Sequence, residues 1–225
     1  MKRILLLLLL LAVPAFAEPL IVHVTVALCD NASQGIVPVP AAIGNGDDPR
    51  TNLYWGASLG VKSWLKREKW QVQTVPAQAP ILERIIAKKT IDGRDVILTA
   101  DAWQGKRIRE AITSFIEQAN GIGPKADVVA YIGHDGLMEF EVKPRTGGKP
   151  VKAIVLACAS RQYFGRHIPD QLLMTNGLMA PEAYTLTAAL EAWIKGTNVP
   201  EAAAQAYNRF QKCGIRGARN LFAQR

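Results

Sequence analysis

Cysteine is scarce in this chain of 225 residues, and no two cysteines form a Cys-x-x-Cys motif. The three that occur are Cys29, Cys158 and Cys213. This pattern excludes a disulfide-dense miniprotein and disfavours a thiol redox protein. Internal repeats and low-complexity stretches are also absent. With 49% hydrophobic and 20% charged residues, the composition is that of a folded globular protein rather than a disordered or collagen-like one.

Long hydrophobic runs are missing too, except at the N-terminus. There, two basic residues precede the apolar run Ile4 to Val13, and Ala15-Phe16-Ala17 follows it. These features are typical of the three regions of a secretory signal. The run is much shorter than the ~20 residues that a membrane-spanning helix requires. We therefore expect a signal peptide over residues 1–17, cleavage near Ala17-Glu18, a periplasmic or secreted location, and no stable membrane insertion.

Basic residues outnumber acidic ones, 27 to 19, for a net charge of +8. Two of the basic residues belong to the expected signal, so the surplus after cleavage is +6. The rest form short clusters without interleaved aromatic residues, at 66–67, 88–89 and 216–219. Such clusters indicate solvated faces, and we predict no nucleic-acid partner. Residues 18–225 are enough for a single large domain.

The order of apolar patterns predicts an α/β fold. Continuous apolar runs and one alternating run indicate strands at 20–28, 70–75, 127–132, 151–157 and 172–175. Helical periodicity indicates helices at 52–66, 105–120 and 183–195, and one or two within 200–222. Residues 32–50 are rich in Gly, Pro, Asn and Asp and predict a long loop. We expect a three-layer sandwich with a mainly parallel sheet, opened by a βαβ unit over 20–75.

A hairpin is expected where Asp92-Gly93 separates residues 85–90 from 96–100. Asp-Gly supplies the positive φ angles that a tight turn needs. Residues 81–89 can also be read as a short helix, and that alternative stays open.

Candidate chemistry follows the strands, because ligands bind outside the carboxyl ends of parallel strands. His134 and Asp135 follow the run 127–132, and Cys158 follows the run 151–157. A thiol and an imidazole at one sheet edge are what nucleophilic cysteine catalysis requires. Glycines on both sides of His134-Asp135 suit close approach of a substrate to the backbone.

Four segments resemble those of the caspase-like peptidases, the group that includes caspases, metacaspases and legumain. ADVVAYIGHDG looks like the strand that ends in the family's His-Gly, and AIVLAC looks like the strand that ends in its Ala-Cys. GKRIREAITSFIEQA is similar to the helix before the histidine strand, and AYTLTAALEAWIKG to a helix of metacaspase-like members. The resemblance spans about 150 residues of element order.

This resemblance implies caspase-like topology and an exported cysteine peptidase or amide hydrolase that acts on a peptide or protein. Cys158 would be the nucleophile, His134 the general acid or base, and the Gly136 amide an oxyanion donor. Asn31 would lie near a position that supports the histidine in legumain. The family's strand order would place Cys29 and Cys158 about 9.6 Å apart, too far for a disulfide. No cofactor is implied.

Two departures keep a second interpretation open. Asp135 separates the histidine from its glycine, and only 24 residues separate His134 from Cys158. A catalytically inactive binding or interaction domain in the periplasm is therefore the alternative. A metal site formed by Cys29, His134 and Cys158 is disfavoured, because no two of them have the close spacing of metal ligands. Loop carboxylates would suit a basic substrate side chain, and loop arginines an acidic one.

The remaining candidate residues have structural interpretations. His23 lies within an apolar strand and is expected to be a core histidine with satisfied hydrogen bonds. Cys213, near the C-terminus, is expected to lie in the core or to form half of a disulfide.

Overall fold

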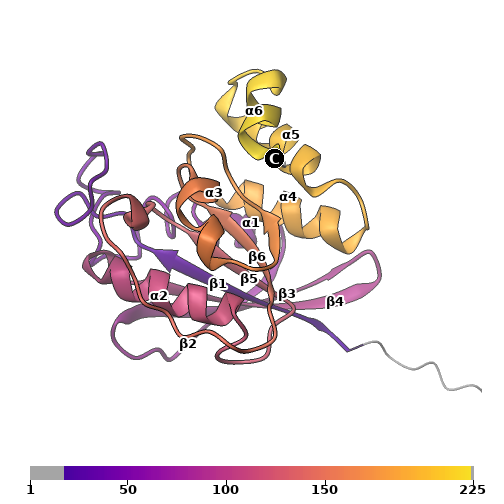
Figure 1. The fold of residues 1–225 in the computed structure, drawn as a ribbon, viewed down its shortest axis with the longest axis horizontal. Coiled ribbons are helices and arrows are strands. Elements are labelled where there is room, and N and C mark those ends of the chain that lie inside the picture. Colours follow the sequence, from indigo (N-terminus) through magenta and orange to yellow (C-terminus); the bar gives the residue numbers. More distant parts are fainter. Residues whose placement is uncertain (1–17, 224–225) are drawn as a thin grey trace, which may run out of the picture.

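A seven-stranded sheet in the order β2-β3-β4-β1-β5-β6-β7 forms the centre of the computed structural model, which describes residues 18–223 (Figure 1). Strands β4, β1, β5, β6 and β7 are parallel, whereas β3 is antiparallel to β4, and β2 to β3. The mainly parallel sheet is thus confirmed, while the expected signal peptide and its cleavage site fall outside the described residues. The strands are β1 (Leu20–Ala27), β2 (Gln71–Val75), β3 (Ile81–Ile91), β4 (Arg94–Trp103), β5 (Val128–Ile132), β6 (Lys152–Leu156) and β7 (Gln171–Leu173).

Helices flank both faces of the sheet, so the α/β architecture has three layers (Figure 1). The first core lies between the sheet and α1, α4, α5 and α6, and the second lies between the sheet and α2. Alternation along β6 shows the division, since Ile154 and Leu156 point into the first core and Val155 into the second. The helices are α1 (Val61–Arg67), α2 (Ile108–Ala119), α3 (Ser160–Tyr163), α4 (Ala183–Ile194), α5 (Val199–Gln211) and α6 (Ile215–Phe222).

Strands β3 and β4 form the expected hairpin, and the alternative of a short helix over 81–89 was wrong. Asp92 and Gly93 make the turn with φ angles of 49° and 75°. Their positive values match the mirror-image turn that suits the right-handed twist of paired strands.

The helix expected over 52–66 begins only at Val61. Before it, the buried Asn52 side chain accepts hydrogen bonds from the Cys29 and Tyr54 amides and donates to the Cys29 carbonyl. These bonds fix Asn52 against the end of β1, and its backbone carbonyl accepts from the amides of Trp55, Gly56 and Ala57, so the chain turns before the helix begins.

The expected βαβ unit over 20–75 forms as β1, α1 and β2, with β2 parallel to β1, but its two strands are not neighbours. Strand β2 does not pair with β1 but lies at the sheet edge, separated from it by β3 and β4. The reason is that β4, the second strand of the hairpin, takes the place beside β1.

The connection from β5 to β6 has no α-helix and runs along α2. It is held by Arg109 on the Glu141 carbonyl (2.6 Å), by the Glu117–Arg145 ion pair (2.7 Å), and by the Val151 amide on the Ala119 carbonyl (3.0 Å). Contacts with α2 thus support the short connection between the two parallel, neighbouring strands β5 and β6.

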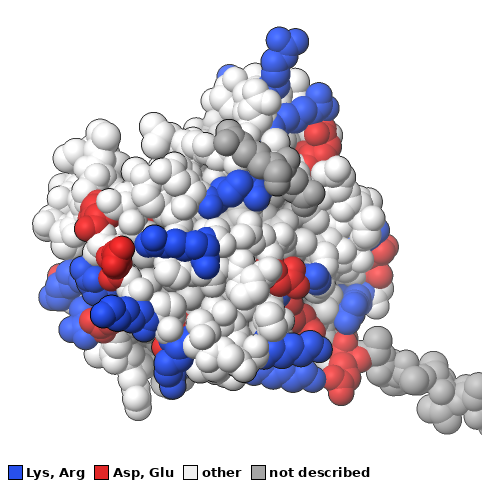
Figure 2. Space-filling model, viewed as in Figure 1, with Lys and Arg blue, Asp and Glu red and all other residues white. Residues whose placement is uncertain are grey.

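Charges of both signs are mixed over the visible face of the molecule (Figure 2). Arginine and lysine side chains lie among acidic ones there (Figure 2). Ion pairs on the surface include Lys152–Asp170 at 3.2 Å. Among residues 18–223, no helix has both the length and the apolar character needed to cross a membrane.

Candidate functional site

The sheet brings the backbones of His134 and Cys158 to the same level. Ile132 of β5 pairs with Leu156 of β6, and each candidate follows its strand by two residues. A hydrogen bond from the Gly133 amide to the Leu156 carbonyl (3.3 Å) continues the pairing toward them. Since neighbouring strands lie about 4.8 Å apart, the two segments leave the sheet side by side at its carboxyl edge.

Glu139 is the partner of the histidine. His134 Nε2 lies 2.6 Å from Glu139 Oε1, and the His134 side chain is only 10% exposed. The same Glu139 oxygen accepts a hydrogen bond from the Gly35 amide (3.0 Å), in the loop after β1. A carboxylate in this position fixes the orientation of the ring. Sequence reasoning missed Glu139, and its one signal was an acidic residue five positions after the histidine.

The Cys158 thiol is half-buried under the chain segment 176–181. Cys158 Sγ lies 3.4 Å from the Met179 amide nitrogen and 3.6 Å from the Met179 carbonyl oxygen. A hydrogen bond from the Ala159 amide to the Gly177 carbonyl (2.8 Å) ties the same segment to the end of β6. The segment 176–181 therefore covers the proposed nucleophile, a contact that the sequence did not predict.

The C-terminal helices hold this segment at both ends. The amide of Asn176 donates to the Leu221 carbonyl (2.9 Å) in α6. Near the other end, the Ala180 amide donates to the Tyr207 hydroxyl (3.0 Å) of α5. Access to Cys158 thus depends on contacts with α5 and α6.

Gly136 uses its amide within the turn. That N–H donates to the His134 carbonyl at 3.1 Å, and the Phe140 ring packs so closely that an added Cβ would lie 2.5 Å from it. The Gly136 amide is therefore occupied rather than free for a substrate oxygen. The Cys158 amide, by contrast, makes no hydrogen bond within the described residues.

Asp135 explains the local turn. Its buried carboxyl accepts a hydrogen bond from the Leu137 amide (3.1 Å) and caps the 3-10 turn Gly136–Met138. The other oxygen, Oδ2, has no partner among residues 18–223. Burial raises the pKa of this carboxyl to about 7, and the nearby Glu139 carboxylate contributes to the rise.

Asn31 lies in the loop after β1 and organises that loop. Its side chain donates to the Val39 carbonyl (2.7 Å) and accepts from the Val39 amide (3.0 Å). Both ends of the amide are engaged there, and the histidine's carboxylate partner is Glu139 instead.

The three cysteines are all unpaired. Cys29 is buried, and burial raises the pKa of its thiol to about 11, so it is protonated at neutral pH. Tyr54 lies beside it, and burial together with the neighbouring Cys29 and Cys158 raises the pKa of the Tyr54 hydroxyl. Cys213 is exposed, so its expected place in the core or in a disulfide was wrong. The reason is that α5 ends at Gln211 and Cys213 falls in the turn before α6.

Other side chains considered for substrate binding already have partners. Arg50 pairs with Asp48 (3.0 Å), and Arg161 donates to the Asn176 side chain (3.0 Å). In the described part of the chain, no group of three His, Cys, Asp or Glu side chains is arranged to hold a metal ion. Comparison of the chain with protein-family models, with curated proteins and with solved structures finds no match.

Proposed function

We propose that the chain is an exported cysteine peptidase or related amide hydrolase of caspase-like topology, with Cys158 as nucleophile and His134 as general acid and base. The observation that carries the proposal is the level placement of His134 and Cys158 after two neighbouring parallel strands. The 2.6 Å contact of His134 with Glu139 adds to it, because a general base that is itself oriented by a third group is typical of nucleophilic sites.

The reaction follows from these groups. Cys158 Sγ transfers its proton to His134, and the thiolate attacks the carbonyl carbon of an amide bond. The C–N bond then breaks as the imidazolium gives its proton to the leaving nitrogen. Water, deprotonated by His134, hydrolyses the thioester and restores the thiol. Glu139 keeps the ring in place throughout.

The oxyanion requires a backbone donor at the sheet edge. The Cys158 amide fits this role because it has no partner within residues 18–223. The Gly136 amide would serve only after its bond to the His134 carbonyl breaks. A substrate must also displace Met179 from the thiol, so the segment 176–181 moves before attack.

A non-catalytic periplasmic binding domain is the second candidate. Two contacts favour it. The Gly136 amide is bonded to the His134 carbonyl, and the Met179 amide is bonded to the Cys158 sulfur, so both groups are occupied in the folded chain. In that case the sheet edge would present a surface to a partner without cleaving it.

A peptide-library cleavage assay on residues 18–225 tests the proposal. Cys158→Ala should abolish turnover, and His134→Ala should lower it about 100- to 10,000-fold. Cys213→Ser is the matched control and should cleave as the parent does, since its thiol lies outside the site. In that Cys213→Ser background, iodoacetamide should modify Cys158 well before the buried Cys29. Unchanged cleavage by Cys158→Ala contradicts the proposal, and a chain that binds library peptides without cleaving any supports the binding domain.

A further inference from the structure

Part of the sheet carries polar side chains on a face that no helix of the described chain covers. On β4, alternate residues differ sharply: Val96, Leu98 and Ala100 are fully buried in the first core, whereas Thr99 and Asp101 are half-buried on the opposite face. Helix α2 lies on that same side but packs on β5, β6 and Ala27 at the end of β1. Strands β3 and β4 are antiparallel, and antiparallel strands commonly bury one face and keep polar residues on the other.

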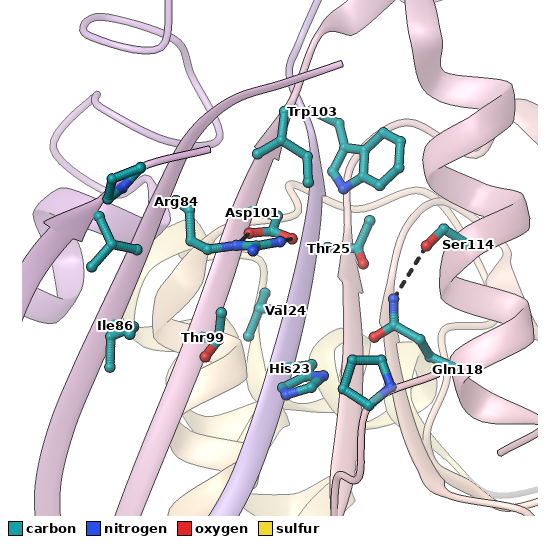
Figure 3. A pocket seen from close by; sticks show the side chains of 14 residues that line it. His23, Val24, Thr25, Arg84, Ile86, Thr99, Asp101, Trp103, Ser114 and Gln118 are labelled. Atoms are coloured by element: carbon teal, nitrogen blue, oxygen red, sulfur yellow. Dashed lines mark hydrogen bonds and ion pairs between the residues drawn. The ribbon is translucent and has the colours of Figure 1, made fainter. Parts of the chain in front are cut away.

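A cavity of about 530 Å³ occupies this place (Figure 3). Its floor is formed by β1, β3 and β4, and one wall by α2 through Ser114 and Gln118. Cavities of about 300–1,000 Å³ are typical of small-molecule sites. Neither Cys158 nor His134 lines it, so it is separate from the proposed catalytic edge.

An ion pair at the centre of the floor leaves the cavity without net charge. Arg84 and Asp101 meet through two hydrogen bonds of 2.5 and 2.6 Å (Figure 3). Among the residues that line this cavity, Asp101 is the only acidic one and Arg84 is the only arginine or lysine. Paired in this way, they still offer spare N–H groups and oxygen lone pairs.

Around that pair lie polar groups with free hydrogen-bonding capacity. The hydroxyls of Thr25 and Thr99 make no hydrogen bond with other lining residues (Figure 3). Trp103 Nε1 is buried without a partner in the described structure. On the opposite wall, the Gln118 side-chain amide donates a long hydrogen bond of 3.2 Å to the Ser114 hydroxyl.

His23 belongs to the same set and is not the core histidine that the sequence suggested, because its half-buried ring faces the cavity (Figure 3). Burial lowers the pKa of His23, so the ring is neutral near pH 7 and offers one donor and one acceptor.

We infer that this cavity binds a small, neutral, polyhydroxylated ligand, of the saccharide class. Sugar hydroxyls donate and accept together, and planar amide, carboxylate, guanidinium and imidazole groups bond them in pairs. The apolar parts of the wall, Ile81, Ile86 and the Trp103 ring, suit the C–H face of a sugar ring. A charged ligand would find no unpaired opposite charge.

Saturation-transfer NMR on residues 18–225 tests this inference, with glucose, N-acetylglucosamine and its β-1,4 dimer as probes and with leucine and acetate as comparison ligands. We expect transfer to at least one saccharide. Thr99→Val should weaken its binding about 5- to 10-fold, as loss of one hydrogen bond implies. Thr90→Val is the matched control, since Thr90 is an exposed strand threonine outside the cavity, and should leave binding unchanged.

Gln118→Leu, on the helix wall, repeats the test away from the sheet and should also weaken binding, while circular dichroism checks that each variant is folded. Absence of transfer to every saccharide overturns the inference, as does transfer to leucine or acetate alone. Equal binding by the parent chain and by both folded variants overturns it too, because the ligand would then bind elsewhere. None of these outcomes bears on the catalytic proposal, because Cys158 and His134 do not line the cavity.

Discussion

At the residue scale, Asp135 is a buried acid placed directly after the proposed general base. One carboxyl oxygen caps a turn and the other has no partner in the described residues. The folded protein therefore favours the protonated form, with a pKa of about 7 instead of 3.8. Such a group stabilises the fold fully below the ordinary pKa, and this contribution is lost as the pH rises through about 7.

Asp135→Asn should consequently raise the free energy of unfolding at pH 8, by about 1–3 kcal/mol, because it removes a buried charge and keeps an acceptor for Leu137. At pH 4 the variant and the parent should be equally stable. Urea unfolding at both pH values measures the difference. Asp95→Asn is the control, since Asp95 is exposed on β4. A gain that is the same at pH 4 and pH 8 would contradict the expectation.

At the element scale, two glycines in open space have opposite conformational roles. Gly93 closes the β3–β4 hairpin with a φ of 75°, and Gly217 lies within α6. An added Cβ would touch nothing within 4 Å at either position. Backbone conformation alone therefore decides the effect of alanine.

Gly93→Ala should lower the free energy of unfolding by about 1 kcal/mol, because the left-handed conformation is costly for alanine. Gly217→Ala should raise it by about 0.5–1 kcal/mol, because alanine favours the helix. Chemical denaturation of the two variants beside the parent measures both effects, and each serves as the control for the other. Shifts of the same sign would mean that contacts, not backbone conformation, determine the outcome.

Elements were predictable where the signal is local. Strands β1, β5 and β6 follow from continuous apolar runs, and the hairpin from Asp92-Gly93, because burial and turn geometry act on neighbouring residues. The edge position of β2 and the late start of α1 depend on distant partners, β4 beside β1 and Asn52 on Cys29. Patterns of neighbouring residues do not report such distant contacts.

The residues of the candidate site also differ in whether a local sequence pattern indicates them. The prediction of His134 and Cys158 rests on their places just after apolar strands. Glu139 and Met179 were missed, since each acts through a loop that only the folded chain brings near. The cavity beside His23 was missed because its polar residues are spread over three strands and one helix.

At the scale of the whole molecule, the C-terminal helices hold the segment that covers the Cys158 thiol. Helix α5 holds Ala180 through the Tyr207 hydroxyl, and α6 holds Asn176. Residues far apart in sequence thus fix the segment 176–181 over Cys158, and loosening either contact should expose the thiol.

Tyr207→Phe should accelerate iodoacetamide modification of Cys158 about 2- to 10-fold, because it removes one hydrogen bond and keeps the ring. Mass spectrometry after timed labelling, in a Cys213→Ser background, gives the rate. Tyr163→Phe is the control, because Tyr163 packs against the second core. An unchanged rate in Tyr207→Phe, or an equal rise in Tyr163→Phe, would show that α5 does not hold the segment.

The short strands at the two borders of the sheet have a consequence for the protein at high concentration. On one side, β7 has only three residues, and on the other, β2 has five, with Gln71, Gln73 and Thr74 exposed. Long, flat, apolar border strands recruit further chains into aggregates, and short polar ones do not. The two border strands therefore offer little length or apolar surface for pairing with a further chain.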